Sequence, residues 1–203
     1  MLLKIHPENP NPHEISIAID HLKAGQVIIY PTDTVYALAC DMLNRKAVER
    51  LCQIKGVKPE QANFSLICNN LSHLSDYTKN VNTATYKLMR KSLPGPFTFI
   101  LNANANVPKI FKRNKKTIGI RIPDNNIAMK LVEELGNPLV STSIHDKDEI
   151  LEYTTDPESI YSRYKDRVEV TIDGGYGNNI ASTIIDCTGE EPLIVREGRG
   201  ILA

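Results

Sequence analysis

Apolar residues recur at helical spacing in several stretches of the chain. From Ile15 to Leu22 every third or fourth residue is apolar, and Gly25 follows. This spacing predicts an amphipathic helix over residues 14–23, because residues three and four apart share one helical face. The same criterion predicts further helices over 45–55, 71–77, 83–91 and 127–135.

Short apolar runs bounded by Pro, Gly or polar residues predict the strands. These runs cover residues 26–30, 64–68, 97–101, 117–122, 139–143, 168–173, 182–187 and 193–197. Helices and strands alternate at first, and short strands gather late in the chain. This order predicts an α/β fold with a mixed sheet and flanking helices, rather than a pure doubly wound fold. With no internal repeat and no linker, residues 1–203 are expected to form a single domain.

The composition excludes some classes of function. The 203 residues carry 24 Lys and Arg against 24 Asp and Glu, so the formal net charge is zero. A protein that coats nucleic acid by bulk electrostatics is therefore excluded, although a local basic groove is not. No apolar run approaches the roughly 20 residues that cross a bilayer, so no membrane partner is expected. The cysteines lack metal-ligand spacing and indicate free thiols in a reducing cytoplasm; they are Cys40, Cys52, Cys68 and Cys187.

Two predicted strands end in clusters of polar side chains. Thr32, Asp33 and Thr34 follow the strand at 26–30, and Ser141 and Ser143 end the strand at 139–143. Open α/β sheets usually bind ligands at the carboxyl ends of strands. Hydroxyl donors suit a carboxylate or a phosphate, but the same residues equally fit turns capped by Thr, Asp and Ser.

Arg121 is the charged residue with the strongest functional signal. It stands within an apolar strand, where a charge is costly unless it faces a partner or a polar cleft. Arg is also suited to bidentate capture of a carboxylate or phosphate. Arg196 lies near the end of the strand at 193–197, which is expected to be buried, and precedes Gly198. A salt bridge at the edge of the core explains Arg196 equally well.

Two further basic segments are candidates for anion binding. Lys55 and Lys58 flank Gly56 at the end of a predicted helix. Five of the eight residues from Lys109 to Lys116 are Lys or Arg. Such a run is most often a solvated loop, and an RNA-binding patch is the alternative. In that alternative the binding residues are Lys112, Arg113, Lys115 and Lys116.

Seven segments, taken in order, resemble the YrdC/YciO family of threonylcarbamoyl-AMP synthases. They are PTDTVYALAC (31–40), the stretch around Lys55, PGPFTFIL (94–101), IGIRIPDN (118–125), PLVSTS (138–143), STIIDC (182–187) and IVREG (194–198). The resemblance implies a twisted mixed sheet around one large concave pocket. It also implies a reaction in which L-threonine, bicarbonate and ATP give threonylcarbamoyl-AMP and pyrophosphate. Mg²⁺ is expected on the phosphates, with no metal ligand from protein side chains.

The resemblance assigns roles by motif. Thr34, Tyr36, Arg121 and Ser143 would bind threonine; Lys55, Lys58, Ser141, Ser182 and Arg196 would bind the nucleotide. Lys55 and Arg121 would be catalytic, mostly by positioning and charge neutralisation, because a carbamate is already nucleophilic. The product would pass to proteins that modify tRNA.

Two departures from the synthase pattern indicate the YciO branch of the family. Val57 stands where the synthases carry an Arg two residues after the Lys, and Lys58 is offset by one position. His145 stands where the synthases carry an Asn. The sequence therefore predicts a synthase that is weakened or altered. The alternatives are a non-catalytic protein that binds double-stranded RNA, tRNA or ribosomes, and a hydrolase of threonylcarbamoyl-AMP.

Overall fold

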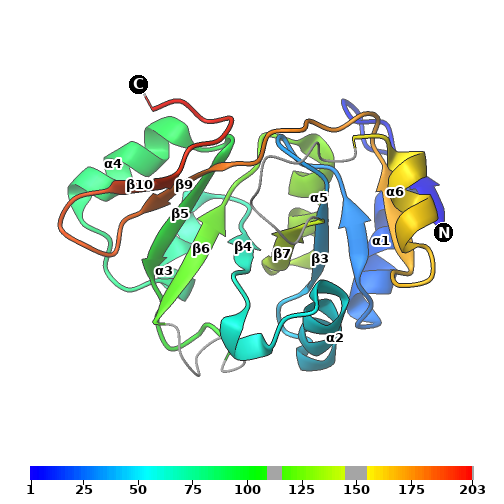
Figure 1. Ribbon diagram of the computed structural model, residues 1–203, viewed down its shortest axis with the longest axis horizontal. Coiled ribbons are helices and arrows are strands. Elements are labelled where there is room, and N and C mark those ends of the chain that lie inside the picture. Colours follow the sequence, from blue (N-terminus) through cyan, green and yellow to red (C-terminus); the bar gives the residue numbers. More distant parts are fainter. Residues whose placement is uncertain (109–115, 145–154, 203) are drawn as a thin grey trace.

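The computed structural model describes residues 1–108, 116–144 and 155–202. Its strands form one twisted sheet in the order β1-β8-β2-β3-β7-β4-β6-β5-β9-β10 (Figure 1). The pairs β1–β8, β2–β8, β4–β6 and β5–β9 are parallel, and the others are antiparallel. The strand bounds are β1 Leu2–Lys4, β2 Ile28–Tyr30, β3 Ala37–Asp41, β4 Ser65–Ile67, β5 Phe97–Asn102, β6 Thr117–Arg121, β7 Leu139–Ser143, β8 Val170–Asp173, β9 Thr183–Asp186 and β10 Leu193–Arg196.

The longer helices begin at residues whose side chains cap the first turn. These side chains accept hydrogen bonds from backbone N–H groups that have no partner within the helix; they belong to Asn11, Asn44, Asn82, Asn125 and Asp156. The helices are α1 Pro12–Lys23, α2 Arg45–Lys55, α3 Leu74–Tyr77, α4 Thr83–Ser92, α5 Asn126–Leu135 and α6 Pro157–Tyr164, with short 3-10 turns at Pro59–Gln61 and Leu71–His73. Gly56 and Gly136 end α2 and α5 in the left-handed conformation that glycine adopts readily.

The sheet separates two apolar cores. Helices α1 and α5 pack on one face, and α2 and α6 contribute to the core on the other (Figure 1). Strand β2 contributes side chains to both cores, because successive side chains of a strand point to opposite faces. Ile28 and Tyr30 belong to the core under α1 and α5, whereas Ile29 belongs to the other core. The predicted α/β class with a mixed sheet and flanking helices is confirmed.

The structure corrects several sequence predictions. Strand β3 and helix α6 were not predicted, and the helix expected over 71–77 is a 3-10 turn followed by the short α3. The prediction that the strand at 193–197 is buried is wrong: Leu193 is 67% exposed and Val195 is 57% exposed. The physical reason is position, because β10 is the last strand of the sheet and is paired with β9. An apolar run predicts a strand, but it does not show whether other elements cover that strand.

The prediction of free thiols is confirmed, since all four cysteines are free and buried. Burial raises the pKa of Cys68 to about 12, and that of both Cys52 and Cys187 to about 11. Such thiols are protonated at neutral pH and behave as small apolar side chains. Within the described ranges, no helix is both long and apolar enough to cross a membrane.

Candidate functional site

Arg121 lies at the end of β6 and pairs with the turn that follows β2. Its Nη2 donates to Asp33 Oδ1 at 2.9 Å and to Thr34 Oγ1 at 3.1 Å. The side chains of Arg121 and Asp33 are only 10% and 8% exposed. The prediction that a charge inside this strand requires a partner is therefore confirmed. The partner is Asp33, to which the sequence analysis assigned no role, although it stands between the two threonines of the matching motif.

The buried ion pair leaves polar atoms without partners. Asp33 Oδ2 and Arg121 Nε are buried and make no hydrogen bond to any residue that the structure describes. Burial raises the pKa of the Asp33 carboxyl, and the neighbouring Arg121 opposes that rise. Buried polar atoms are nearly always hydrogen-bonded. These two atoms are therefore exceptions that need an explanation, and a bound water or a polar ligand would satisfy them.

Hydroxyl groups fix the shape of the turn that carries Asp33. Thr32 Oγ1 donates to the backbone oxygen of Val35 at 2.7 Å and accepts from the backbone N–H of Thr34 at 3.1 Å. Thr32 Oγ1 also lies 3.0 Å from Thr34 Oγ1. Both threonine side chains are buried. The alternative of a turn capped by Thr is thus correct for Thr32, and the same turn delivers Asp33 and Thr34 to Arg121.

The connection from β8 to β9 packs against this turn. Asn178 donates from its backbone N–H to the oxygen of Thr34 at 3.0 Å. Tyr36, which is fully buried, donates from its hydroxyl to the oxygen of Gly175 at 2.6 Å and accepts from the N–H of Gly174 at 3.2 Å. Desolvation raises the pKa of the Tyr36 hydroxyl. In Figure 1 this connection runs along the top of the sheet, between β8 and β9.

The hydroxyls of β7 have separate partners. Ser141 lies 2.9 Å from the Tyr30 hydroxyl and donates to the backbone oxygen of Leu38 at 3.1 Å. Burial raises the pKa of Tyr30 to about 12, and the charges of Arg121 and Asp33 also act on it. Ser143 offers its backbone oxygen to Lys55 Nζ at 2.9 Å. The structure thus joins a residue predicted for the nucleotide, Lys55, to one predicted for threonine.

Ser182 and Arg196 also lie together. Arg196 donates from Nη2 to the backbone oxygen of Ser182 at 2.8 Å, and the Ser182 hydroxyl lies 2.8 Å from Thr98 Oγ1. Gly198 donates its N–H to Thr183 Oγ1 at 3.0 Å. The tail after β10 therefore folds back onto the start of β9. Thr98 was missed by sequence reasoning because nothing in an apolar strand marks one threonine as facing a distant serine.

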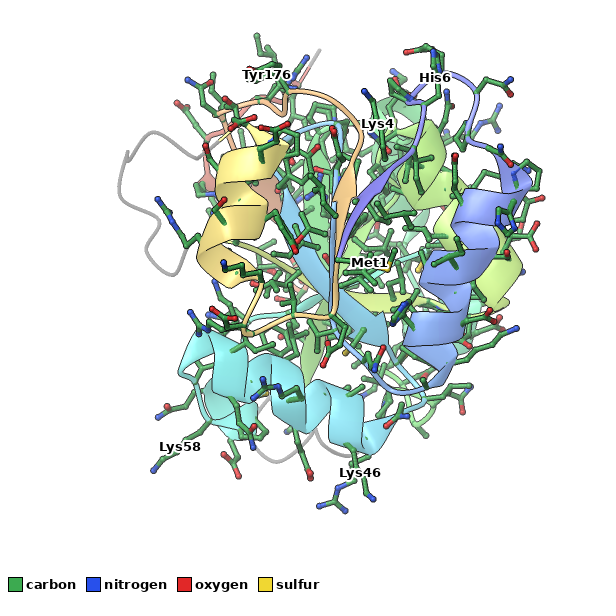
Figure 2. All side chains as sticks on the ribbon, turned by 90° about the vertical axis from the view of Figure 1, so that its right-hand side faces the viewer. Met1, Lys4, His6, Lys46, Lys58 and Tyr176 are labelled. Atoms are coloured by element: carbon green, nitrogen blue, oxygen red, sulfur yellow. The ribbon has the colours of Figure 1, made fainter. Side chains whose placement is uncertain are left out.

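Lys58 differs from the other predicted site residues. It is exposed, and Figure 2 shows it pointing outward beneath α2, at the opposite end of the molecule from Tyr176. Val57, which replaces the Arg of the synthase pattern, is partly buried and packs against the core. The next residue, Lys58, then faces solvent. Of the basic run, Lys116 is exposed just before β6. Lys112, Arg113 and Lys115 lie outside the described residues, and so does His145.

Two cavities elsewhere on the molecule are lined by other residues. One, of about 200 Å³, is lined by residues that include Cys68, His73 and Asn137. The other, of about 1020 Å³, lies between the lead-in to α1 and the end of β8, and its lining includes Lys4, His6 and Asp173. Neither is lined by a predicted site residue. Among the described residues, no group of three or more His, Cys, Asp or Glu side chains could hold a metal ion.

Comparisons with known proteins place the chain in a family. The Sua5/YciO/YrdC family model, described as "Telomere recombination", matches residues 20–198. The chain belongs to this family. It is 44% identical to an uncharacterized protein of Haemophilus influenzae over 98% of this chain and 96% of that one. It is 42% identical to the uncharacterized protein YciO of Escherichia coli, over 97% and 94% of the two chains.

Solved structures agree with this assignment. The crystal structure of Escherichia coli YciO superposes with a TM-score of 0.91 at 40% identity, covering 99% of this chain and 97% of that one. Sua5 of Pyrococcus abyssi in complex with L-threonine superposes with a TM-score of 0.88 at 26% identity, covering 98% of this chain and 57% of that one. A threonylcarbamoyl-AMP synthase of Pyrococcus abyssi is 27% identical over 91% of this chain and 54% of its own length. The family thus includes threonylcarbamoyl-AMP synthases, and relatives with higher identity are YciO proteins.

Proposed function

We propose that this protein binds L-threonine at Arg121 and forms threonylcarbamoyl-AMP from threonine, bicarbonate and ATP, at a rate below that of a full synthase. The observation that carries this proposal is the buried Arg121–Asp33 pair, which retains an unpartnered donor and an unpartnered acceptor. A structural neighbour complexed with L-threonine supports the choice of amino acid. The product would be passed to tRNA-modifying proteins.

The chemistry proposed for the chain is positioning and charge neutralisation. An oxygen of the threonine carbamate attacks the α-phosphorus of ATP, and pyrophosphate leaves. Lys55 would approach the phosphates, and Ser141, Ser182 and Arg196 would contribute further donors around the nucleotide. Mg²⁺ would arrive with ATP, because this ion usually binds through substrate phosphates and keeps several waters. Fixed donors that match the charge of a transition state lower its energy without reorganisation.

A direct assay tests this proposal. Purified protein is incubated with L-threonine, bicarbonate, ATP and Mg²⁺, and pyrophosphate and the adenylate are measured. Lys55→Met is expected to reduce the rate about 30- to 1,000-fold, since one transition-state contact is worth roughly 2–4 kcal/mol. Lys46→Met is the matched control, because Lys46 is an exposed lysine at the other end of α2. Lys58→Met in the same series decides whether the neighbouring lysine contributes.

Two outcomes would contradict the proposal. No adenylate above the blank, with a known synthase active alongside, would exclude synthase activity. If added threonylcarbamoyl-AMP decays faster with the protein than without it, the result would instead support the hydrolase alternative. An unchanged decay would dismiss that alternative.

RNA binding remains a prediction from the basic run. Charge reversal at Lys112, Arg113, Lys115 and Lys116 is expected to weaken binding to double-stranded RNA or tRNA at least tenfold. It should also flatten the dependence of affinity on salt, because each lost phosphate contact removes released counterions. Filter binding across a salt series measures both effects. Affinity and salt slope that match those of the wild type would refute the prediction.

A further inference from the structure

Strand β10 is an edge of the sheet that carries an exposed apolar run. It pairs with β9 on one side and ends the strand order, so no strand lies along its other side in the part of the chain that the structure describes (Figure 1). Leu193, Ile194 and Val195 follow one another and are all exposed, Ile194 at 44%. Single apolar residues on a surface are ordinary, whereas three in a row on an open edge indicate a surface that another chain covers.

The opposite edge of the sheet is protected against such pairing. Strand β1 has only three residues, of which Leu3 is buried and Lys4 is an exposed charge at the end. Short strands and lysines are usual means by which an edge avoids other chains. Strand β10 has a register irregularity between Ile194 and Arg196, which is another such means, but its first three residues carry no charge. The edge that is suited to adding a strand is therefore β10 rather than β1.

The two ends of β10 differ in charge. Glu190 and Glu191 precede the strand, and both are exposed. The other end carries two arginines, Arg196 and Arg199, against one glutamate, Glu197. The tail continues beside the lead-in to β9, to which Arg199 donates its backbone N–H at 2.8 Å. The acidic and the basic residues therefore lie at opposite ends of one open edge.

A second copy of the same strand complements both the apolar run and the charges. Antiparallel pairing of two β10 strands places the start of one beside the end of the other, so the glutamates of each copy approach the arginine end of the other copy. A parallel neighbour would place like charges together, which is unfavourable. A two-fold axis uses the same surface on both copies and closes the assembly, so both open edges are occupied at once.

We propose that this protein forms a homodimer in which β10 pairs antiparallel with β10 of a second copy, so that the two sheets become continuous. Main-chain hydrogen bonds along the strands give the affinity in this mode of recognition, and the side chains give the specificity. With strands of four residues the interface is small. We therefore expect a reversible dimer with a Kd on the order of 10 μM. The proposal is independent of the activity proposed above.

Sedimentation equilibrium of the full chain, over about 1–300 μM, measures the dimer. The average mass should rise from that of one chain towards that of two. Ile194→Lys places a charge on the open edge and is expected to raise the Kd at least about tenfold. Leu43→Lys is the matched control, because Leu43 is an exposed apolar residue in the turn before α2, and it should leave the Kd unchanged.

Two charge variants test the antiparallel arrangement. The double variant Glu190→Lys, Glu191→Lys and the single variant Arg199→Glu should each self-associate about 3- to 10-fold more weakly than the wild type, because like charges then meet. An equal mixture of the two should form a mixed dimer with an affinity within about threefold of the wild type, since opposite charges meet again at both ends. A folding defect in either variant would not be repaired by mixing.

Hydrogen exchange locates the interface. The backbone amides of Leu193–Arg196 should exchange more slowly as the protein concentration rises, because pairing protects the outer edge of β10. A wild type that stays monomeric over the whole range would overturn the proposal, even if β10 then binds a different protein. So would a dimer that Ile194→Lys leaves intact, a mixture that does not recover, or amides whose exchange does not depend on concentration.

Discussion

Replacing Arg121 with Met is expected to lower the free energy of unfolding by about 3–5 kcal/mol at neutral pH, the usual cost of leaving a buried charge without its partner. The pair is suited to this test because its side chains are 10% and 8% exposed. Asp33 would lose its ion-pair partner, and its Oδ2 already lacks a partner in the described residues. Urea denaturation of the variant and the wild type measures the difference.

The deficit of Arg121→Met should shrink in acid. Burial raises the pKa of Asp33 in the folded protein, and removing Arg121 removes the main influence that lowers it. A carboxyl whose folded pKa exceeds its unfolded value destabilises the fold above the folded pKa, and this penalty is lost as the pH falls through that value. A deficit that is equal at neutral pH and at about pH 5 would contradict this account.

A double variant provides the control for the buried charge. Asp33→Asn combined with Arg121→Met removes both charges, and we expect it to recover a large part of the lost stability, as replacement of a whole buried ion pair often does. Arg163→Met, at an exposed position of α6, is the matched single control and should stay within about 0.5 kcal/mol of the wild type.

Gly198→Ala is expected to have the second large effect, on stability and on nucleotide binding together. A Cβ atom at this position would overlap the backbone oxygen of Ala181 and would lie 2.6 Å from the carbonyl carbon of Ser182. Backbone atoms cannot move aside as a flexible side chain can, so the tail must shift away from β9. Overpacking of this kind costs about 1–3 kcal/mol. The shift would also displace Arg196, which donates to the Ser182 oxygen at 2.8 Å.

Gly189→Ala is the matched control for this substitution. A Cβ atom there would have its nearest neighbour, the backbone oxygen of Glu191, at 3.9 Å. We expect no loss of stability, and thermal unfolding of both variants measures the contrast. Nucleotide binding by calorimetry should weaken for Gly198→Ala alone. Equal behaviour of the two variants would show that the approach of Gly198 to Ser182 has no such effect.

Local pattern predicted α1, α2, α4 and α5 closely, because their signals are local. The helix over 45–55 was predicted with the bounds that α2 has, since its apolar residues recur at helical spacing within a few turns. Strand β3 was missed for the opposite reason. Ala37–Asp41 has only five residues, and its place between β2 and β7 depends on distant pairing.

The candidate site was predicted in its parts but not in its connections. Arg121 was singled out because a charge inside an apolar strand needs a partner, and that reasoning uses the sequence alone. Its partner could not be identified, because Asp33 is 88 residues away and any of several carboxylates was available. The contact of Lys55 with Ser143 likewise spans 88 residues and joins two elements that carry separate signals.

The sequence by itself determined the class of fold, the helices α1, α2, α4 and α5, the free thiols and the segments that could carry chemistry, because the periodicity and burial of apolar groups act over a few residues. Only the tertiary structure decided that β10 is an exposed edge, that Lys58 faces solvent and that Asp33 and Thr34 share one nitrogen of Arg121. Those outcomes depend on which strands become neighbours. Strand order is set by the whole sheet, and no short segment encodes it.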